Sequence, residues 1–329
     1  MATVLLPLRI ALPLLLDIVR LVAGFALLAG GATLLVSGGV TLARRFGVSP
    51  LVTGLTVVAL GTSLPEVVVG GLAAARAEHG LLFGTVLGSN VANMGLVLGV
   101  TSFVLPATLG ERLSMRELGW LLGSLGLLLL VLLDGRLDRL DAGVLLGAFG
   151  LYQVLLLRNP GEEGEAALEV DDPPETRHPW LFVVGGSVGI AIGAELVMQG
   201  GVALATRLGV PSEVIGFTVL AVGTSLPELA AGIASGLKGH AEVGIGNVVG
   251  SNVFNVLAVV GVAGAVQPTL EGQQPLVEGI ARLDLPITAA ASVALAVLLG
   301  FRAGTGLRTK GAALAGLYVV WSLWNFTRG

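Results

Sequence analysis

One hexapeptide, Gly-Thr-Ser-Leu-Pro-Glu, occurs twice in this chain, at Gly61–Glu66 and Gly223–Glu228, and each copy interrupts a long hydrophobic run. Each copy places an acid, a proline and two hydroxyl groups where a dry interior would otherwise be expected. Such groups are tolerated only where they face one another or a wet cavity. The fold must therefore bring polar groups together inside an apolar body.

The surrounding sequence predicts an all-α membrane protein. Of the 329 residues, 54% are hydrophobic and 12% are charged, and the mean hydropathy is +0.91, whereas soluble domains carry roughly 25% charged residues. The apolar runs are often about 16 to 27 residues long, which suits helices that cross a hydrocarbon layer and not the short alternating strands of an outer-membrane barrel. The chain has no cysteine, which excludes disulfides and thiolate metal ligands.

Charged and turn-rich breaks divide the chain into ten predicted membrane spans. These cover residues 19–43, 50–76, 80–105, 117–133, 141–157, 180–205, 212–237, 242–267, 284–300 and 311–327. We expect residues 1–18 to form an N-terminal extension that leads into the first span. The acidic stretch 158–179, which contains Pro and Gly, is expected to be a linker between two halves, 19–157 and 180–329.

A shift of 162 residues aligns these halves. It pairs Gly24 with Gly186 and Gly31 with Gly193, it pairs the two hexapeptides, and it pairs Gly-Ser-Asn-Val-Ala-Asn at 88–93 with Gly-Ser-Asn-Val-Phe-Asn at 250–255. Self-similarity of this kind marks a duplicated unit. With an odd number of spans in each unit, the second copy enters the membrane upside down. The result is an inverted repeat, an architecture that places substrate sites near the bilayer midplane.

The repeated hexapeptide supplies oxygen ligands of the kind that hard cations prefer. An ionisable group at the centre of a membrane helix costs roughly 2.5–3.5 kcal/mol to insert, so Glu66 and Glu228 are expected to face the bundle interior and to be functional. Each follows a proline, which cannot donate to the carbonyl one turn earlier and so frees a backbone oxygen. Oxygens of this kind suit Ca²⁺ and Na⁺. Neighbouring hydroxyl groups are those of Thr62, Ser63, Thr224 and Ser225.

The Gly-Ser-Asn motifs add further oxygen donors. Ser89 and Asn93 lie four residues apart, as do Ser251 and Asn255, so each pair shares one helix face and can point into the same cavity. Hydrogen bonding between helices is an equally good interpretation of these four residues.

The remaining ionisable residues are expected to be structural. Glu195 has no acidic counterpart in the first half, and His79, His178 and His240 fall in predicted loops, where surface exposure is the default. The glutamates of the 158–179 linker lack the ligand spacing of an EF-hand loop, so a solvated connector is expected there.

Together these motifs resemble the two signature repeats of the cation/calcium antiporter superfamily, specifically its prokaryotic sodium/calcium exchangers. The resemblance runs from about Gly24 onward. It implies ten transmembrane helices in two inverted five-helix repeats, with a cation site formed by the second, third, seventh and eighth spans. The central carboxylate ligands would be Glu66 and Glu228. The other implied ligands are oxygens of Thr62, Ser63, Thr224 and Ser225, the backbone carbonyls of Ala59 and Ala221, and the side chains of Ser89, Asn93, Ser251 and Asn255.

The resemblance implies secondary active exchange of Na⁺ for Ca²⁺ by alternating access, electrogenic if more than two Na⁺ move per Ca²⁺. It implies no enzymatic activity and no cofactor, and the chain shows no sign of nucleic-acid binding or of a required protein partner. The alternative is a K⁺-dependent or H⁺-coupled exchanger of Ca²⁺ or another divalent cation on the same fold. Asparagine at positions 93 and 255 disfavours K⁺, and the lack of the Gly-Asn-Ala-x-Glu motif of proton/calcium exchangers disfavours H⁺.

Two functions of other classes can be weighed on the same residues. An intramembrane hydrolase built on the two acids and a serine would lack a nearby His or Lys base. A passive cation channel would differ from an exchanger by carrying flux without a counter-ion gradient. We expect a multi-pass protein of the inner (cytoplasmic) membrane. The Lys and Arg distribution favours both termini outside and the acidic linker in the cytoplasm.

Overall fold

The computed structural model describes residues 2–105, 115–158, 176–210, 223–269, 279–280, 282, 285–300 and 307–326, and all regular structure in them is helical. In the first half the elements are α1 (Ala2–Phe46), α2 (Pro50–Thr53), η1 (Gly54–Val58), α3 (Ala59–Thr62), α4 (Leu64–Ala75), α5 (His79–Ala92), η2 (Asn93–Val97), α6 (Leu98–Val104), α7 (Met115–Val131) and α8 (Arg139–Arg158). In the second half they are α9 (Pro179–Arg207), α12 (Leu226–Leu237), α13 (Ala241–Phe254), η6 (Asn255–Val259), α14 (Val260–Val266), α16 (Leu285–Gly300) and α17 (Leu307–Phe326). The elements named η are single π-helical turns.

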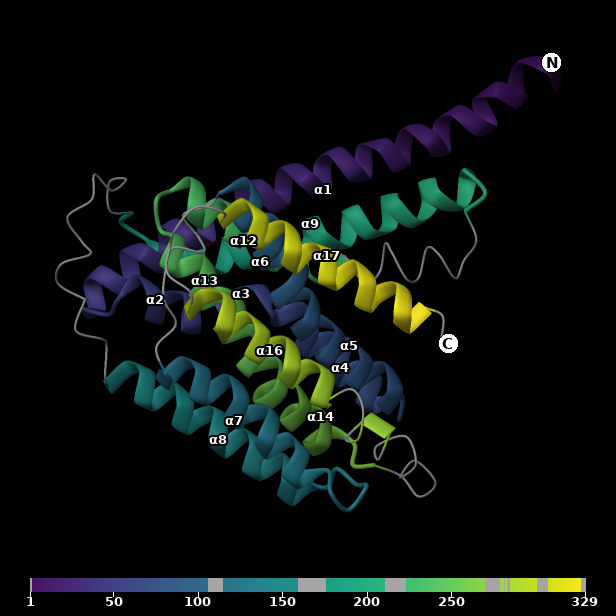
Figure 1. Ribbon diagram of the computed structural model, residues 1–329. Coiled ribbons are helices and arrows are strands. Elements are labelled where there is room, and N and C mark those ends of the chain that lie inside the picture. The colour runs from purple at the N-terminus through teal and green to yellow at the C-terminus, as the bar shows by residue number, and fades with distance from the viewer. Residues whose placement is uncertain are drawn as a thin grey trace.

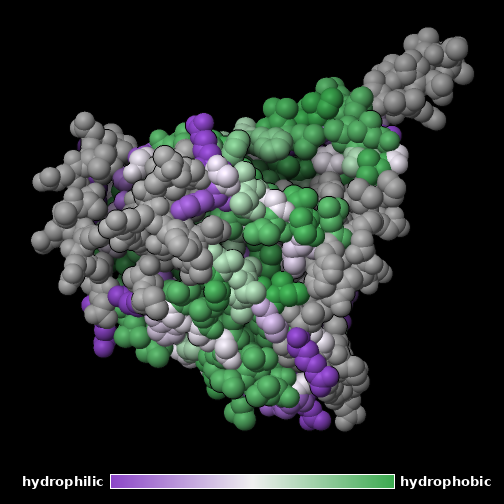
Figure 2. Space-filling model, viewed as in Figure 1, coloured by the Kyte–Doolittle hydropathy of each residue, from purple (hydrophilic) through white to green (hydrophobic). Residues whose placement is uncertain are grey.

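The all-helical prediction is confirmed for the described residues. Each of the ten predicted spans overlaps a helical stretch, although residues 212–222 of the seventh lie outside the described part. Among the described residues, five continuous helical stretches are long and apolar enough to cross a membrane, or six if the bent pair Pro50–Thr62 and Leu64–Ala75 forms one span. Residues 2–18, expected to form an extension, are the first turns of α1. Figure 2 shows that the coloured part of this face is mostly hydrophobic, with hydrophilic residues in small separate groups.

Helices α1 and α9 lie side by side and pack through glycine (Figure 1). A Cβ atom on Gly24 would come 2.8 Å from the carbonyl oxygen of Gly193, and one on Gly31 would come 2.8 Å from that of Gly186. Contacts this short leave no room for a side chain, so glycine is required for the approach. The partner number falls as the α1 number rises, which means that the two helices are antiparallel.

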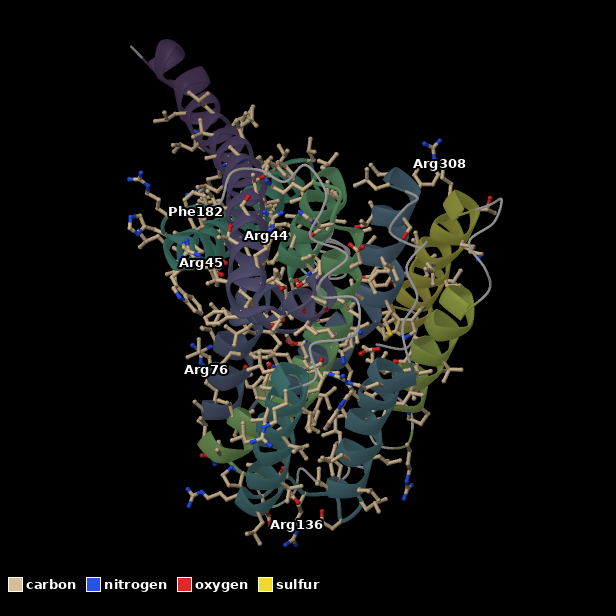
Figure 3. The ribbon with its side chains drawn as sticks, turned by 90° about the vertical axis from the view of Figure 1, so that its left-hand side faces the viewer. Arg44, Arg45, Arg76, Arg136, Phe182 and Arg308 are labelled. Carbon is tan, nitrogen blue, oxygen red and sulfur yellow. The ribbon has the colours of Figure 1, made fainter. Side chains whose placement is uncertain are left out.

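The ends of this helix pair are joined by arginines. Figure 3 labels Arg44 and Arg45 near Phe182, where α1 ends and α9 begins. There Arg45 Nη2 donates to the carbonyl oxygen of Thr176 at 2.9 Å. At the opposite end, Arg207 Nε forms a 2.7 Å ion pair with the buried carboxylate of Asp17. Arg45 and Arg207 are equivalent under the 162-residue shift.

The second half repeats the element boundaries of the first. At a shift of 162 residues α4, α5, η2 and α6 coincide residue for residue with α12, α13, η6 and α14. The halves also pack against each other through their later helices. Helix α17 of the second half packs on α6 of the first, and α8 of the first half packs on α14 of the second. Two of the hydrophobic core clusters consequently contain residues of both halves.

Candidate cation site

Both hexapeptides break their helix at the serine. Ser63 (φ −89°, ψ 6°) separates α3 from α4, and Ser225 (φ −96°, ψ 4°) precedes α12. The helical segments on either side of Ser63 are bent by 50°. The carbonyl oxygen of Ala59 accepts bonds from Ser63 N at 3.0 Å and from Thr62 Oγ1 at 3.3 Å. Proline follows each break within the first turn of the next helix, where its missing N–H costs nothing.

The two acids of the hexapeptides lie in the first turns of α4 and α12 and are buried. Glu66 is 1% exposed and Glu228 is 0% exposed. Ser89 Oγ donates to Glu66 Oε1 at 3.3 Å, and Ser63 Oγ donates to Glu228 Oε1 at 3.4 Å. The second bond crosses from the first half to the second, so the two acidic breaks meet in the interior.

Neither carboxylate has a basic partner among the described residues. The ion pairs found in the described residues join arginines to Asp17 and do not reach Glu66 or Glu228. Their second oxygens, Glu66 Oε2 and Glu228 Oε2, are buried and accept no hydrogen bond. A buried carboxylate without a partner is costly, and such groups in a membrane bundle mark ion pathways.

Thr62 joins the first hexapeptide to α13. Its Oγ1 donates to Asn247 Oδ1 at 3.1 Å and lies 3.4 Å from Ser251 Oγ. Asn247 is fully buried and was not expected at the site. The sequence signal that points to it is its position four residues before Ser251, on the same face of α13.

Four asparagines form a symmetric hydrogen-bond network, the asparagine network, between α5–η2 and α13–η6. Asn90 Nδ2 donates to Asn252 O at 3.1 Å, and Asn252 Nδ2 donates to Asn90 O at 3.4 Å. Asn93 Nδ2 donates to Asn252 Oδ1 at 3.1 Å, and Asn255 Nδ2 donates to Asn90 Oδ1 at 3.1 Å. The amide nitrogens of Asn93 and Asn255 are thus used between the helices, while their Oδ1 atoms have no partner.

This asparagine network fits both interpretations of the Gly-Ser-Asn motifs, hydrogen bonding between helices and cation ligation. The amide nitrogens act as interhelical glue, which orients the amide oxygens of Asn93 and Asn255 as free acceptors. The side-chain oxygens of Asn252 and Asn90 accept these hydrogen bonds, and neither residue was predicted from the sequence. Each stands directly after a serine that was predicted as a ligand, Ser89 or Ser251.

The remaining predicted ligands are placed as follows. Ser225 is buried and its Oγ has no partner, whereas Thr224 is half-buried. Ala221 lies outside the described residues. No cluster of three or more His, Asp or Glu residues that could hold a metal occurs in the described ranges. Any cation here would therefore depend on hydroxyl and amide oxygens as well as on the two carboxylates.

The buried atoms left without partners at this place are all possible cation ligands, apart from Asn247 Nδ2. They are Glu66 Oε2, Glu228 Oε2, Asn93 Oδ1, Asn255 Oδ1 and Ser225 Oγ. Carboxylate, amide and hydroxyl oxygens suit hard cations such as Ca²⁺ and Na⁺ and lack the imidazole or thiolate that Zn²⁺ and Cu²⁺ favour. Two carboxylates balance one divalent cation or a small number of monovalent ones.

The residues expected to be structural divide into two groups. Glu195 is exposed and accepts a 2.6 Å bond from Gln199 Nε2, and His178 is exposed before α9. The expected surface position of His79 and His240 is wrong, because they are 1% and 5% exposed. Both stand where a tight turn leads directly into a buried helix, α5 or α13, so packing of that helix covers them.

Comparison with known proteins agrees with this geometry. The family described as "Sodium/calcium exchanger protein" matches residues 16–158 and 178–327. Inner membrane protein YrbG of Escherichia coli is 34% identical over 311 residues, which cover 92% of this chain and 94% of the relative. Sodium/calcium exchanger MaX1 of Methanosarcina acetivorans is 30% identical over 343 residues, which cover 91% of this chain and 95% of the relative.

A solved structure has the same fold. The sodium-calcium exchanger NCX_Mj, soaked with Na⁺ and Ca²⁺, superposes with a TM-score of 0.74 and 27% identity, covering 93% of this chain and 97% of that one. The chain is thus a multi-pass membrane protein of a transporter family. Its motifs, its paired acidic helix breaks and these matches together show that it belongs to the sodium/calcium exchanger family.

Proposed function

We propose that this protein exchanges Na⁺ for Ca²⁺ across the inner membrane by alternating access. The observation that carries the proposal is the meeting of two buried acidic helix breaks, one from each half, whose free oxygens have no basic partner in the part of the chain that the structure describes. The same oxygens would hold either one Ca²⁺ or several Na⁺, never both. Exchange would follow from this mutual exclusion, because only occupied states would cross the membrane.

The proposed architecture is ten transmembrane helices in two inverted repeats. It is supported by the crossed contacts of Gly24 with Gly193 and of Gly31 with Gly186, because the shift of 162 residues turns each contact into the other. A two-fold axis that relates antiparallel helices is perpendicular to them, and for membrane helices such an axis lies in the membrane plane. The start of α1 and the end of α17 lie on the same side in Figure 1, as an even number of spans requires.

The proposed ligands are those that the two motifs supply. Glu66 and Glu228 are the central ligands, and Asn93 and Asn255 present amide oxygens beside them. The remaining proposed ligands are Thr62, Ser63, Thr224, Ser225, Ser89, Ser251 and the carbonyls of Ala59 and Ala221. With more than two Na⁺ per Ca²⁺ the cycle moves net charge, which is worth about 2.3 kcal/mol per elementary charge per 100 mV.

The proposed moving element is the α1–α9 pair. These helices are long and contact each other through glycine backbones, and such small-residue contacts let two helix backbones approach closely without interlocked side chains between them. Both termini are proposed to lie outside, with residues 158–179 as an acidic cytoplasmic linker and with no cofactor or protein partner required. The protein is proposed to carry ions without chemical turnover.

The experiment that tests the function is ion flux in proteoliposomes. Purified protein should take up ⁴⁵Ca²⁺ when the vesicles contain Na⁺ and the outside does not. If more than two Na⁺ leave for each Ca²⁺ that enters, net positive charge leaves the vesicle. Uptake should therefore increase when a K⁺ diffusion potential, set with valinomycin, makes the vesicle interior positive. Uptake that continues without any counter-ion gradient would identify a channel and would refute exchange.

The K⁺-dependent or H⁺-coupled alternative is tested in the same vesicles. When a pH gradient replaces the Na⁺ gradient, Ca²⁺ uptake should stay at background. When K⁺ is added on the Na⁺ side, Na⁺-driven Ca²⁺ uptake should be unchanged. Uptake driven by protons, or strict dependence on K⁺, would favour the alternative.

A further inference from the structure

Two adjacent buried hydroxyl groups of α6, outside the central site, have no hydrogen-bond partner among the described residues. Thr101 and Ser102 of α6 are 1% and 0% exposed, and the side-chain oxygens of both lack a partner within the described structure. A hydroxyl group that is removed from water without a hydrogen bond destabilises the fold. Their burial therefore needs an explanation.

Other helical hydroxyls of this chain show the usual solution. Thr41, Ser235 and Ser292 are buried and donate to the carbonyl oxygen four residues earlier, at 2.7 to 2.8 Å. This bond is available to most serines and threonines within a helix. Thr101 and Ser102 do not make it, and in this they resemble Ser225 of the central site. Their oxygens are thus free for a ligand that is not part of the protein.

Thr101 faces α12 one turn beyond the central acid. A Cβ atom on Gly232 would come 3.0 Å from Thr101 Oγ1, and one on Gly236 would come 2.6 Å from Leu105 Cδ1. Glu228, Gly232 and Gly236 are spaced by four residues and share one helix face, each step being about 6 Å along the axis. Leaving Glu228 along α12, a cation would first meet the hydroxyl of Thr101 and then the apolar side chain of Leu105.

The equivalent place in the other half is apolar. The shift of 162 residues carries Thr101 to Ala263, Ser102 to Gly264 and Gly232 to Gly70. A Cβ atom on Gly70 would meet Val259 Cγ1 at 2.6 Å and Leu82 Cδ1 at 3.2 Å. The two halves thus repeat the backbone but differ in the chemistry that borders α4 and α12.

We propose that Thr101 and Ser102 form a transfer site for the transported cation, one helical turn from Glu228 on a path between α6 and α12. This proposal rests on the proposed function. Two neutral hydroxyls can replace a few water ligands of Na⁺ or Ca²⁺ but cannot balance its charge. Such a site holds a cation weakly enough for it to leave, which passage requires. It serves the membrane face at which α12 ends.

The absence of cysteine from the chain allows a direct test of the path. Thr101→Cys and Ala263→Cys are compared in full-length protein in proteoliposomes that cycle Na⁺ against Ca²⁺, with a membrane-impermeant cationic methanethiosulfonate as probe. Only a hydrated thiol ionises and reacts readily, so Thr101→Cys should be modified at least about tenfold faster than its symmetry equivalent. Equal rates at the two positions, or no reaction at position 101, would overturn the proposal.

Transport provides the second readout. A variant with Thr101→Val and Ser102→Ala should exchange about tenfold more slowly, the effect of losing ligands that each act like one hydrogen bond, while Ca²⁺ binding at equilibrium is unchanged. Thr101→Ser keeps the hydroxyl and should restore the rate. Ser292→Ala, which removes a buried hydroxyl bonded to its own helix, is the matched control.

Each result decides between the proposals. An unchanged exchange rate overturns the transfer site, and so does loss of equilibrium Ca²⁺ binding in a folded double variant, because that would assign the hydroxyls to the central site. Should the double variant fail to fold, the comparison of single cysteines still decides. Wild-type protein that carries no Na⁺-driven Ca²⁺ flux would refute the proposed function itself, whatever the labelling shows.

Discussion

The two places where the halves meet are built on opposite principles. At the centre, α5–η2 and α13–η6 are joined by side-chain hydrogen bonds among four buried asparagines. Along α1 and α9 the halves meet through glycine backbones, with arginine contacts near the ends. Directed bonds fix one relative position of two helices, whereas a smooth glycine surface permits several. Under the proposed cycle, the asparagine-joined centre is therefore the part that stays fixed, and the glycine-lined contact of α1 with α9 is the part expected to shift.

The largest effect is expected at the centre, from removing one acidic charge. Glu66→Gln or Glu228→Gln should lower Na⁺-driven Ca²⁺ uptake at least about a hundredfold, because one of two carboxylates that balance a divalent cation is lost. Glu195→Gln is the matched control, since Glu195 is exposed and bonded to Gln199. All three variants should elute as folded protein. Retained uptake in either central variant would remove that residue from the mechanism.

The next effect tests whether the glycine surface depends on close approach. A Cβ atom on Gly186 would lie 2.5 Å from Leu35 N and 2.7 Å from Gly31 O, whereas one on Gly185 would meet no atom within 4 Å. Gly186→Ala should cost about 1–3 kcal/mol of stability through overpacking and should slow exchange. Gly185→Ala should be neutral or slightly stabilising, because alanine favours the helix. Thermal denaturation compares the two, and equal melting temperatures would contradict the close packing.

These two regions also show what the sequence could predict. The 162-residue repeat located both acids, both helix breaks and the glycines that pair α1 with α9, because each depends on a residue type with a strong local meaning. The hydrogen-bond roles of Asn90, Asn252 and Asn247 were missed, since they depend on which helix crosses which. The burial of His79 and His240 was missed for the same reason: a turn in sequence can be covered in the folded bundle.

A smaller effect is expected from substitutions in the asparagine network. Asn90→Ala and Asn252→Ala each remove an amide that accepts one interhelical bond and donates another. Each change should lower the apparent Ca²⁺ affinity about tenfold, because Asn93 or Asn255 loses the bond that orients its oxygen. Asn90 and Asn252 make equivalent hydrogen bonds in this network, so the two variants should have similar effects. Ser124→Ala, at a buried serine bonded to its own helix, is the control.

The smallest effect is expected from removing the ion pair between Arg207 and Asp17, near one end of the α1–α9 contact. Arg207 Nε lies 2.7 Å from Asp17 Oδ2, and the arginine side chain is 41% exposed. The buried Asp17 carboxylate keeps a second partner, Arg20 Nη1 at 3.1 Å, so losing Arg207 should cost no more than a partly exposed pair contributes, about 1 kcal/mol or less. Arg207→Gln should therefore change the exchange rate about fivefold at most. Its counterpart Arg45 donates to a backbone oxygen of Thr176 and has no acidic partner within the described residues, so Arg45→Gln should have a still smaller effect.

The direction of the Arg207→Gln effect separates two roles for the pair. If Asp17 and Arg207 restrain α9 against α1 during the cycle, the variant exchanges faster at low ionic strength, and the difference disappears in high salt, which screens the wild-type pair. If the pair only stabilises the resting fold, the variant melts at a lower temperature and exchanges no faster. Exchange rates measured at two ionic strengths, with melting temperatures alongside, distinguish these outcomes. A faster, salt-sensitive variant would show that even the smooth interface is controlled by a directed contact.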